Sequence, residues 1–190
     1  MRRIASEITE GLSRPVEKAW AIYQFITTRV KYSFMRDYFQ IDDPAEFCAV
    51  NGIGDCGLQA LMFIVLCRIS GIPARWQSGL EMDGTSGGCH DWDQFYLDGW
   101  GWLFADPSYG GGAWESGSAS RHAFYFGNLD PLRMAANRVF QAPLMPESTH
   151  LRMDPFDHQS GEIERIGAER PFTGRETDGE VKILFVEDVE

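Results

Sequence analysis

The sequence lacks any long hydrophobic run. No stretch of its 190 residues approaches the roughly 20 consecutive apolar residues of a membrane-spanning helix, so no membrane insertion is expected. The first residues include two arginines but no apolar segment, so no signal peptide is expected either. A cytoplasmic location is the default expectation. A fragment of a longer, exported protein stays open, because helical patterning begins within about ten residues of the start.

Positive charge is also scarce. The chain has 17 Lys and Arg against 28 Asp and Glu, for a net charge of −11, which argues against nucleic acid or an anionic membrane as partner. The 44% hydrophobic and 24% charged residues are typical of a globular protein. The length predicts one domain over residues 1–190, with a core at about 12–110 and a C-terminal extension at about 121–190. The oligomeric state stays open.

Cysteine is sparse and widely spaced. None of the four cysteines forms the C-x-x-C pair of a structural zinc site, so neither metal nor cofactor is expected. A domain of this size does not need a disulfide framework. Three cysteines are interpreted as packing residues: Cys48, Cys67 and Cys89.

The hydrophobic pattern predicts helices followed by antiparallel strands. This order indicates an α+β fold with a buried central helix packed against an antiparallel β-sheet. Helices are predicted at 13–32 and from Leu58 to Ile69, strands at 74–82, 90–97, 102–105, 162–166 and 181–186, a mixed loop at 33–53 with room for a short helix, and a Gly/Ser-rich loop at 110–120.

Cys56 stands at the start of the central helix. Asp55 is a good N-cap, so Cys56 takes the first helical position, where free backbone N–H groups and the helix dipole are expected to lower the pKa of its thiol. Gly54 and Gly57 are expected to leave space for a substrate beside the sulfur.

His90 and Asp106 have the spacing of partners across a hairpin. Their numbers sum to an even value, so alternation lets them share one face if the loop around 98–101 has an odd length. A carboxylate beside a histidine orients the imidazole, which can hold a cysteine as thiolate. Asp106 before Pro107 is equally compatible with a turn start. Asp91 and Asp93 alternate to the other face and are expected to be solvated.

With these residues in place, the chain resembles the transglutaminase-like superfamily, whose core is papain-like. The resemblance covers about residues 12–110, and residues 121–166 are similar, less specifically, to the tail of bacterial members. Its motifs are Gly54-Asp55-Cys56, Gly71-Ile72-Pro73-Ala74-Arg75, His90-Asp91-Trp92 and the run from Trp102 to Asp106-Pro107-Ser108.

The resemblance implies roles for individual residues. Cys56 would be the nucleophile, His90 the general base and acid, and Asp106 the orienting carboxylate. The Cys56 N–H would donate to the oxyanion. Candidates for the second donor are Asn51, Gln40, Tyr32 and Gln59, and candidates for a substrate cleft are Trp92 and Trp102 with Trp100 and Tyr109, although hairpin packing explains these aromatic residues equally well.

The implied activity is cysteine-dependent acyl transfer through a thioester. The substrate would be a peptide, protein or amide, and hydrolysis is the first choice because the calcium-binding loops and β-sandwich domains of large animal transglutaminases are missing from this sequence. A protein-glutamine transglutaminase and a non-catalytic binding or scaffold module of the same fold are the alternatives.

Overall fold

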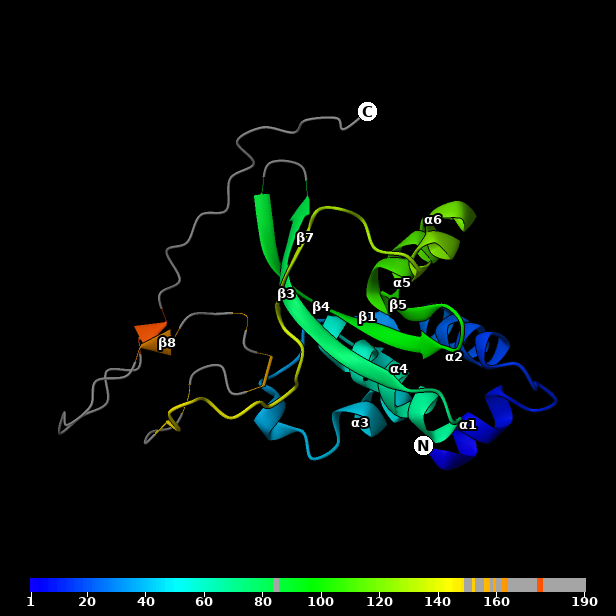
Figure 1. The fold of residues 1–190 in the computed structure, drawn as a ribbon, viewed down its shortest axis with the longest axis horizontal. Helices are drawn as coiled ribbons and strands as arrows, with labels where there is room; N and C mark the ends of the chain where they lie inside the picture. The colour runs from blue at the N-terminus through cyan, green and yellow to red at the C-terminus, as the bar shows by residue number, and fades with distance from the viewer. Residues whose placement is uncertain are drawn as a thin grey trace. The chain divides into compact units, whose positions relative to one another are not determined.

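The computed structural model describes residues 1–83, 86–148, 152, 156–157, 159, 162–163 and 174–175 (Figure 1). The chain divides into two compact units, one formed by residues 1–77 and 91–130, the other by residues 78–90 and the described residues from 131 onward. The predicted strand at 181–186 and residues 164–166 of another predicted strand lie outside the described residues.

Helices dominate the first unit. The helix predicted at 13–32 runs only from Pro15 to Arg29, because proline occupies its first turn and the chain enters a short strand at Lys31. The segment predicted as a mixed loop contains a short 3-10 helix, an α-helix and a second short strand. The elements up to residue 54 are α1 (Arg2–Ile8), α2 (Pro15–Arg29), β1 (Lys31–Tyr32), the 3-10 helix η1 (Tyr38–Gln40), α3 (Pro44–Asn51) and β2 (Ile53–Gly54).

The central helix is α4 (Cys56–Ile69), as the apolar pattern predicts. Most of its residues are buried, and Phe63 meets Phe95 of the sheet with ring centroids 5.8 Å apart. Gly71 follows the helix at φ +81°, a left-handed conformation that glycine adopts without strain. Figure 1 shows α4, in cyan, behind the strands β4 and β5.

The main sheet has five strands in the order β6-β5-β4-β3-β7. In the β4–β5 hairpin, Asp93 pairs with Ala105 and Leu97 with Gly101. The loop between them therefore has the odd length that shared strand parity requires, and Gly99 and Gly101 have φ of 80° and 85°. Helices and an antiparallel sheet confirm the α+β prediction. The strands are β3 (Ala74–Asp83), β4 (Ser86–Leu97), β5 (Gly101–Ala105), β6 (Phe126–Gly127) and β7 (Arg133–Asn137).

The prediction of a loop at 110–120 is wrong. The segment forms α5 (Pro107–Glu115) and α6 (Ala119–Phe124) instead. Asp106 caps α5, and Gly110, one of the glycines that suggested a loop, serves close packing, because a Cβ there would lie 1.9 Å from the Tyr23 hydroxyl of α2. Tertiary packing here overrides the low helix propensity of glycine.

The second unit pairs β7 with β3, a strand that the proline-punctuated sequence did not reveal. The register shifts between Ser78 and Gly79, where a Cβ on the glycine would lie 2.0 Å from the Met134 carbonyl oxygen. Glycine is thus required by the approach of β7. Two further short strands, β8 (Glu162–Ile163) and β9 (Gly174–Arg175), pair with each other.

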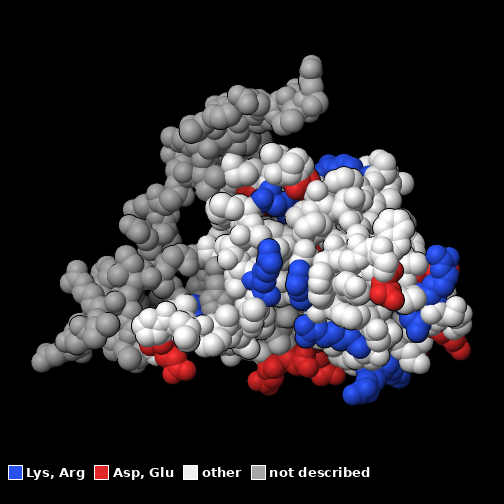
Figure 2. All heavy atoms as spheres, viewed as in Figure 1, with Lys and Arg blue, Asp and Glu red and all other residues white. Residues whose placement is uncertain are grey.

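Across the part of the chain that the structure describes, every helix is too short or too polar to span a bilayer. On the face shown in Figure 2, basic and acidic side chains are interspersed over the described atoms. The negative net charge therefore does not gather into one acidic surface on that face.

Candidate active site

The pairing of β1 with β2 delivers Tyr32 to the start of α4. Tyr32 lies opposite Gly54 in a parallel register, and the Ser33 N–H donates to the Gly54 carbonyl at 3.2 Å. Gly54 is two residues before Cys56, so a residue far upstream in the sequence becomes a neighbour of the thiol segment.

Asp55 caps α4 as predicted. Its Oδ1 accepts from the Leu58 N–H at 3.0 Å and from the Tyr38 hydroxyl at 2.8 Å. Cys56 is the first residue of the helix. The cap satisfies one of the free N–H groups of the first turn and holds the cysteine at the helix mouth.

The sulfur of Cys56 contacts Asp91 of β4. The thiol donates to Asp91 Oδ2 at 3.4 Å, and the Asp91 backbone N–H donates to the sulfur. The expectation that Asp91 and Asp93 are solvated is wrong, since they are only 2% and 0% exposed. They alternate with Phe95 onto the face of β4 that packs against α4, so this face is core.

The expected fall in the pKa of the Cys56 thiol is also wrong for this arrangement. Burial raises the pKa of Cys56 well above its usual value, and the negative charges of Asp91 and Asp55 raise it further. The Asp91 N–H acts in the opposite direction but does not reverse the effect. Desolvation and two nearby carboxylates outweigh the helix dipole, whose effect is modest.

The two glycines beside Cys56 do not leave open space. A Cβ at Gly57 would lie 2.1 Å from the Tyr38 hydroxyl and 2.9 Å from Asp91 Oδ2, and one at Gly54 would lie 2.9 Å from the Cys48 sulfur. The prediction of space for a substrate is wrong at these two positions, because the protein's own side chains occupy it.

Tyr32 is the oxyanion-donor candidate that the structure places beside the thiol. A side-chain hydrogen bond with Cys56 contributes to raising the pKa of Tyr32, after the larger effects of burial and of the charge of Cys56. The residue is nevertheless 50% exposed. Tyr32 therefore combines an interaction with the sulfur and partial exposure to solvent.

The other donor candidates have different surroundings. The Gln59 amide donates to the Gly54 carbonyl at 3.0 Å and is buried, so it braces the turn before α4. The Asn51 amide donates to the Phe47 carbonyl of its own helix at 2.8 Å. Gln40 is exposed on η1. Neither Gln59 nor Asn51 has its amide directed at Cys56.

Asp106 is fully buried and caps α5. Its Oδ1 accepts from the Tyr109 N–H at 3.0 Å and the Ser108 hydroxyl at 3.1 Å. Its charge raises the pKa of Asp93, after the larger effect of burial. Strand parity does not describe its side chain, because β5 ends at Ala105 and the chain turns into the helix.

His90 is buried, with 5% exposure, and lies on β4 directly before Asp91. It is the last residue of its segment in the second unit, whereas Cys56 and Asp106 belong to the first. The assignment of Cys56, His90 and Asp106 as a catalytic triad stays a prediction.

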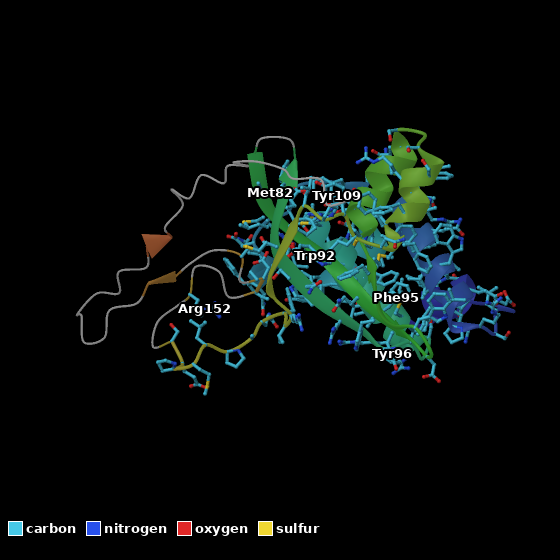
Figure 3. The ribbon with its side chains drawn as sticks, turned by 45° about the horizontal axis from the view of Figure 1, so that its top comes forward. Met82, Trp92, Phe95, Tyr96, Tyr109 and Arg152 are labelled. Carbon is cyan, nitrogen blue, oxygen red and sulfur yellow. The ribbon has the colours of Figure 1, made fainter. Side chains whose placement is uncertain are left out.

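The aromatic residues predicted for a cleft have separate environments. Trp92 is buried in the middle part of β4 and donates from Nε1 to Gln77 Oε1 at 2.6 Å (Figure 3). Trp102 packs under the Arg75 guanidinium at 3.9 Å, and Trp100 is 78% exposed at the hairpin turn. Tyr109 packs against Tyr125. Packing therefore explains Trp92, Trp102 and Tyr109.

The structure adds Asp91 and Tyr38 to the candidate site. The alternation of side chains along the strand had already placed Asp91 and His90 on opposite faces, but it did not indicate which face packs against α4. No sequence signal identified Tyr38. His122 is a second buried histidine, whose Nε2 lies 2.8 Å from the Thr27 hydroxyl.

The described cysteines are all free thiols. Cys48 and Cys67 are buried, as predicted, whereas Cys89 is exposed and so is not a packing residue. Among the described residues, no cluster of three or more His, Cys, Asp or Glu side chains could hold a metal ion.

Comparison with known proteins identifies the family to which the chain belongs. The family model of the transglutaminase-like superfamily matches residues 2–107. None of the curated proteins matches the chain closely enough to count as a relative.

One solved structure shows the same kind of fold, and a second is similar over part of the chain. A candidate cysteine protease from Cytophaga hutchinsonii shares 24% identity at a TM-score of 0.50, with 56% of this chain and 36% of that chain covered. The periplasmic domain of TgpA from Pseudomonas aeruginosa shares 22% identity at a TM-score of 0.48, with 64% of this chain and 46% of that chain covered. This chain thus spans less than half the length of either protein.

Proposed function

The chain belongs to the transglutaminase-like superfamily, and from this premise we propose that it hydrolyses peptide or amide bonds with Cys56 as nucleophile. The observation that carries the proposal is the position of Cys56 at the capped start of α4, within a family whose motif cysteine stands there. The fold likeness to a candidate cysteine protease supports the same reaction class.

The reaction proceeds through a thioester. The thiol proton passes to His90 as the sulfur attacks the carbonyl carbon, and the C–N bond breaks as His90 returns the proton to the departing amine. Water then attacks the thioester and gives a proton to His90. The C–S bond breaks, the acid leaves, and the proton returns to sulfur. Asp106 orients the imidazole and stabilises its charged form.

The oxyanion of each tetrahedral intermediate needs two donors. The Cys56 N–H at the helix start is the first. We assign Tyr32 as the second, because the residue is half-exposed and its hydroxyl interacts with the Cys56 sulfur. The side-chain amides of Gln59 and Asn51 already donate to backbone carbonyls.

The test is a library of peptides and proteins incubated with the wild-type chain and with Cys56→Ala. New amino termini that appear only with the wild type support hydrolysis of peptide bonds. Ammonia without new termini indicates side-chain amide hydrolysis, and ammonia with incorporation of an added primary amine indicates transglutaminase activity. Equal product from both proteins would overturn Cys56 as nucleophile. No product, with retained peptide binding, would support the scaffold alternative.

A further inference from the structure

Two groups of Asp91 interact with the Cys56 sulfur, and they have opposite effects on the ionisation of the thiol. Its Oδ2 accepts from the thiol at 3.4 Å, which favours the protonated sulfur. Its backbone N–H donates to the same sulfur, which favours the thiolate. One residue thus presents both a stabiliser of the resting thiol and a stabiliser of the reactive anion.

The Asp91 carboxylate has a larger effect on the Cys56 thiol than the Asp91 N–H does. The groups with a resolved electrostatic interaction with Cys56 are Asp91 from β4, Asp55 from the cap of α4, Tyr32 from β1 and Tyr38 from η1. The two carboxylates repel a thiolate, and burial removes water that would solvate it. The Asp55 carboxylate is already shared between the Tyr38 hydroxyl and the Leu58 N–H, whereas Asp91 Oδ2 accepts directly from the thiol.

We propose that Asp91 is a positioning residue that keeps the Cys56 thiol protonated and turned toward the sheet at rest, and that neutralising its carboxylate releases the sulfur for attack. The proposal rests on the proposed function, in which Cys56 is the nucleophile. A proton on Oδ2, or a substrate amide N–H that donates to it, removes the repulsion. The Asp91 N–H then remains to stabilise the thiolate.

Asp91 is not the base that activates the sulfur. Reference pKa values are about 3.9 for Asp and about 8.5 for Cys, so transfer of the thiol proton to a carboxylate is strongly uphill. The thiol proton therefore needs another acceptor, the role assigned to His90 above. Asp91 acts on the nucleophile through its charge and its hydrogen bonds alone.

The test measures alkylation of Cys56 by iodoacetamide across pH, read by peptide mass mapping. Asp91→Asn keeps the backbone N–H and the shape but removes the charge, so the alkylation midpoint should fall by about one pH unit or more. The rate at about pH 7 should then rise about tenfold. Asp91→Glu restores the charge and should return the midpoint toward that of the wild type.

Asp93→Asn is the matched control. Asp93 lies on the same face of β4 and is equally buried, but its charge acts on Cys67 rather than on Cys56. This variant should leave the Cys56 midpoint unchanged. A purely structural role for Asp91 would lower the melting temperature of Asp91→Asn without moving the midpoint, and that result would overturn the proposal. An equal shift in Asp93→Asn would also overturn it.

A second measurement needs no variant. The wild-type chain is labelled with a cationic and an anionic methanethiosulfonate, and the rate ratio at Cys56 is compared with that at exposed Cys89. A carboxylate at the sulfur predicts a larger cationic preference at Cys56, and equal ratios would contradict it. These labelling results do not depend on turnover. Failure of amide hydrolysis would therefore remove the proposed function while leaving the labelling result intact.

Discussion

Each end of α4 carries a cysteine thiol, and the two thiols differ in their exposure to solvent. Cys56 begins the helix in contact with Asp91, and Cys67 lies near the end of the helix, where the charge of Asp93 acts on it. Burial and a carboxylate of β4 raise the pKa of both thiols well above the usual value. Cys67 is fully buried, however, whereas Cys56 is partly exposed and interacts with half-exposed Tyr32.

The comparison teaches that a thiol beside a buried carboxylate is not by itself a site. The packing of α4 on one face of β4 exposes a thiol at either end of the helix to the charge of a buried carboxylate. What distinguishes Cys56 is the helix start, whose free N–H groups can face an anion, together with a route to solvent. The last turn of a helix presents carbonyl oxygens instead, which disfavour a thiolate.

The largest difference in activity should appear when each of the two cysteines is replaced by alanine in a separate variant. Cys56→Ala should lower amide hydrolysis at least about 10³-fold, because it removes the nucleophile. Cys67→Ala should keep turnover while losing about 1 kcal/mol of unfolding free energy through the small cavity it leaves. Steady-state kinetics and thermal unfolding of both variants measure these outcomes. A comparable loss of turnover in both would erase the distinction between the two ends.

Next in size is the effect of Asp106, which belongs to neither thiol pair. Asp106→Asn should lower turnover about 10²-fold or more, since an amide cannot stabilise a charged imidazole. Asparagine also caps helices well, so the melting temperature should stay near that of the wild type. Asp106→Ala should lose about 1 kcal/mol in addition, because the cap of α5 is lost. Full activity in Asp106→Asn would show that another group orients His90.

Gly57→Ala sharpens the comparison at the Cys56 end. Its Cβ would lie 2.1 Å from the Tyr38 hydroxyl, so this tyrosine or the start of α4 must move. We expect a loss of about 1–3 kcal/mol of unfolding free energy in denaturant titrations, despite the higher helix propensity of alanine. Gly112→Ala, at a helical position with nothing within 4 Å, is the control and should be neutral or stabilising. Equal behaviour of the two variants would refute the packing at Gly57.

The smallest effect concerns the Cys67 end. Burial raises the pKa of Asp93 well above its usual value, and its carboxylate oxygens lack a hydrogen-bond partner among the described residues. As pH rises above about 3.9, the unfolded chain ionises Asp93 while the folded chain resists, so stability falls toward the folded pKa. Asp93→Asn removes this titration. It should be about 1 kcal/mol more stable than the wild type near pH 7, with the difference vanishing toward pH 3. Thermal unfolding across this pH range measures it, and a difference that does not change with pH would contradict the assignment.

Local sequence signals predicted α4 and the β4–β5 hairpin, but not β1 and η1, which carry Tyr32 and Tyr38. Asp55 and the apolar spacing after it predicted where α4 starts, and Gly99 with Gly101 predicted a hairpin between β4 and β5. The helices at 107–124 were missed because packing against Tyr23, a residue distant in sequence, favours glycine inside a helix there. Strand β7 was missed because its pairing partner, β3, is also distant in sequence.

The sequence by itself determined that Cys56 opens a helix and that Asp91 and Asp93 share one face of a strand, because capping and alternation are local rules. Only the tertiary structure decided that this face packs against α4 and brings Asp91 to the sulfur. It also decided that the parallel pairing of β1 and β2 brings Tyr32 there. Alternation states which residues lie together but not what each face of the strand packs against, and the hydrophobic surface of α4 decides that Asp91 and Asp93 face the helix.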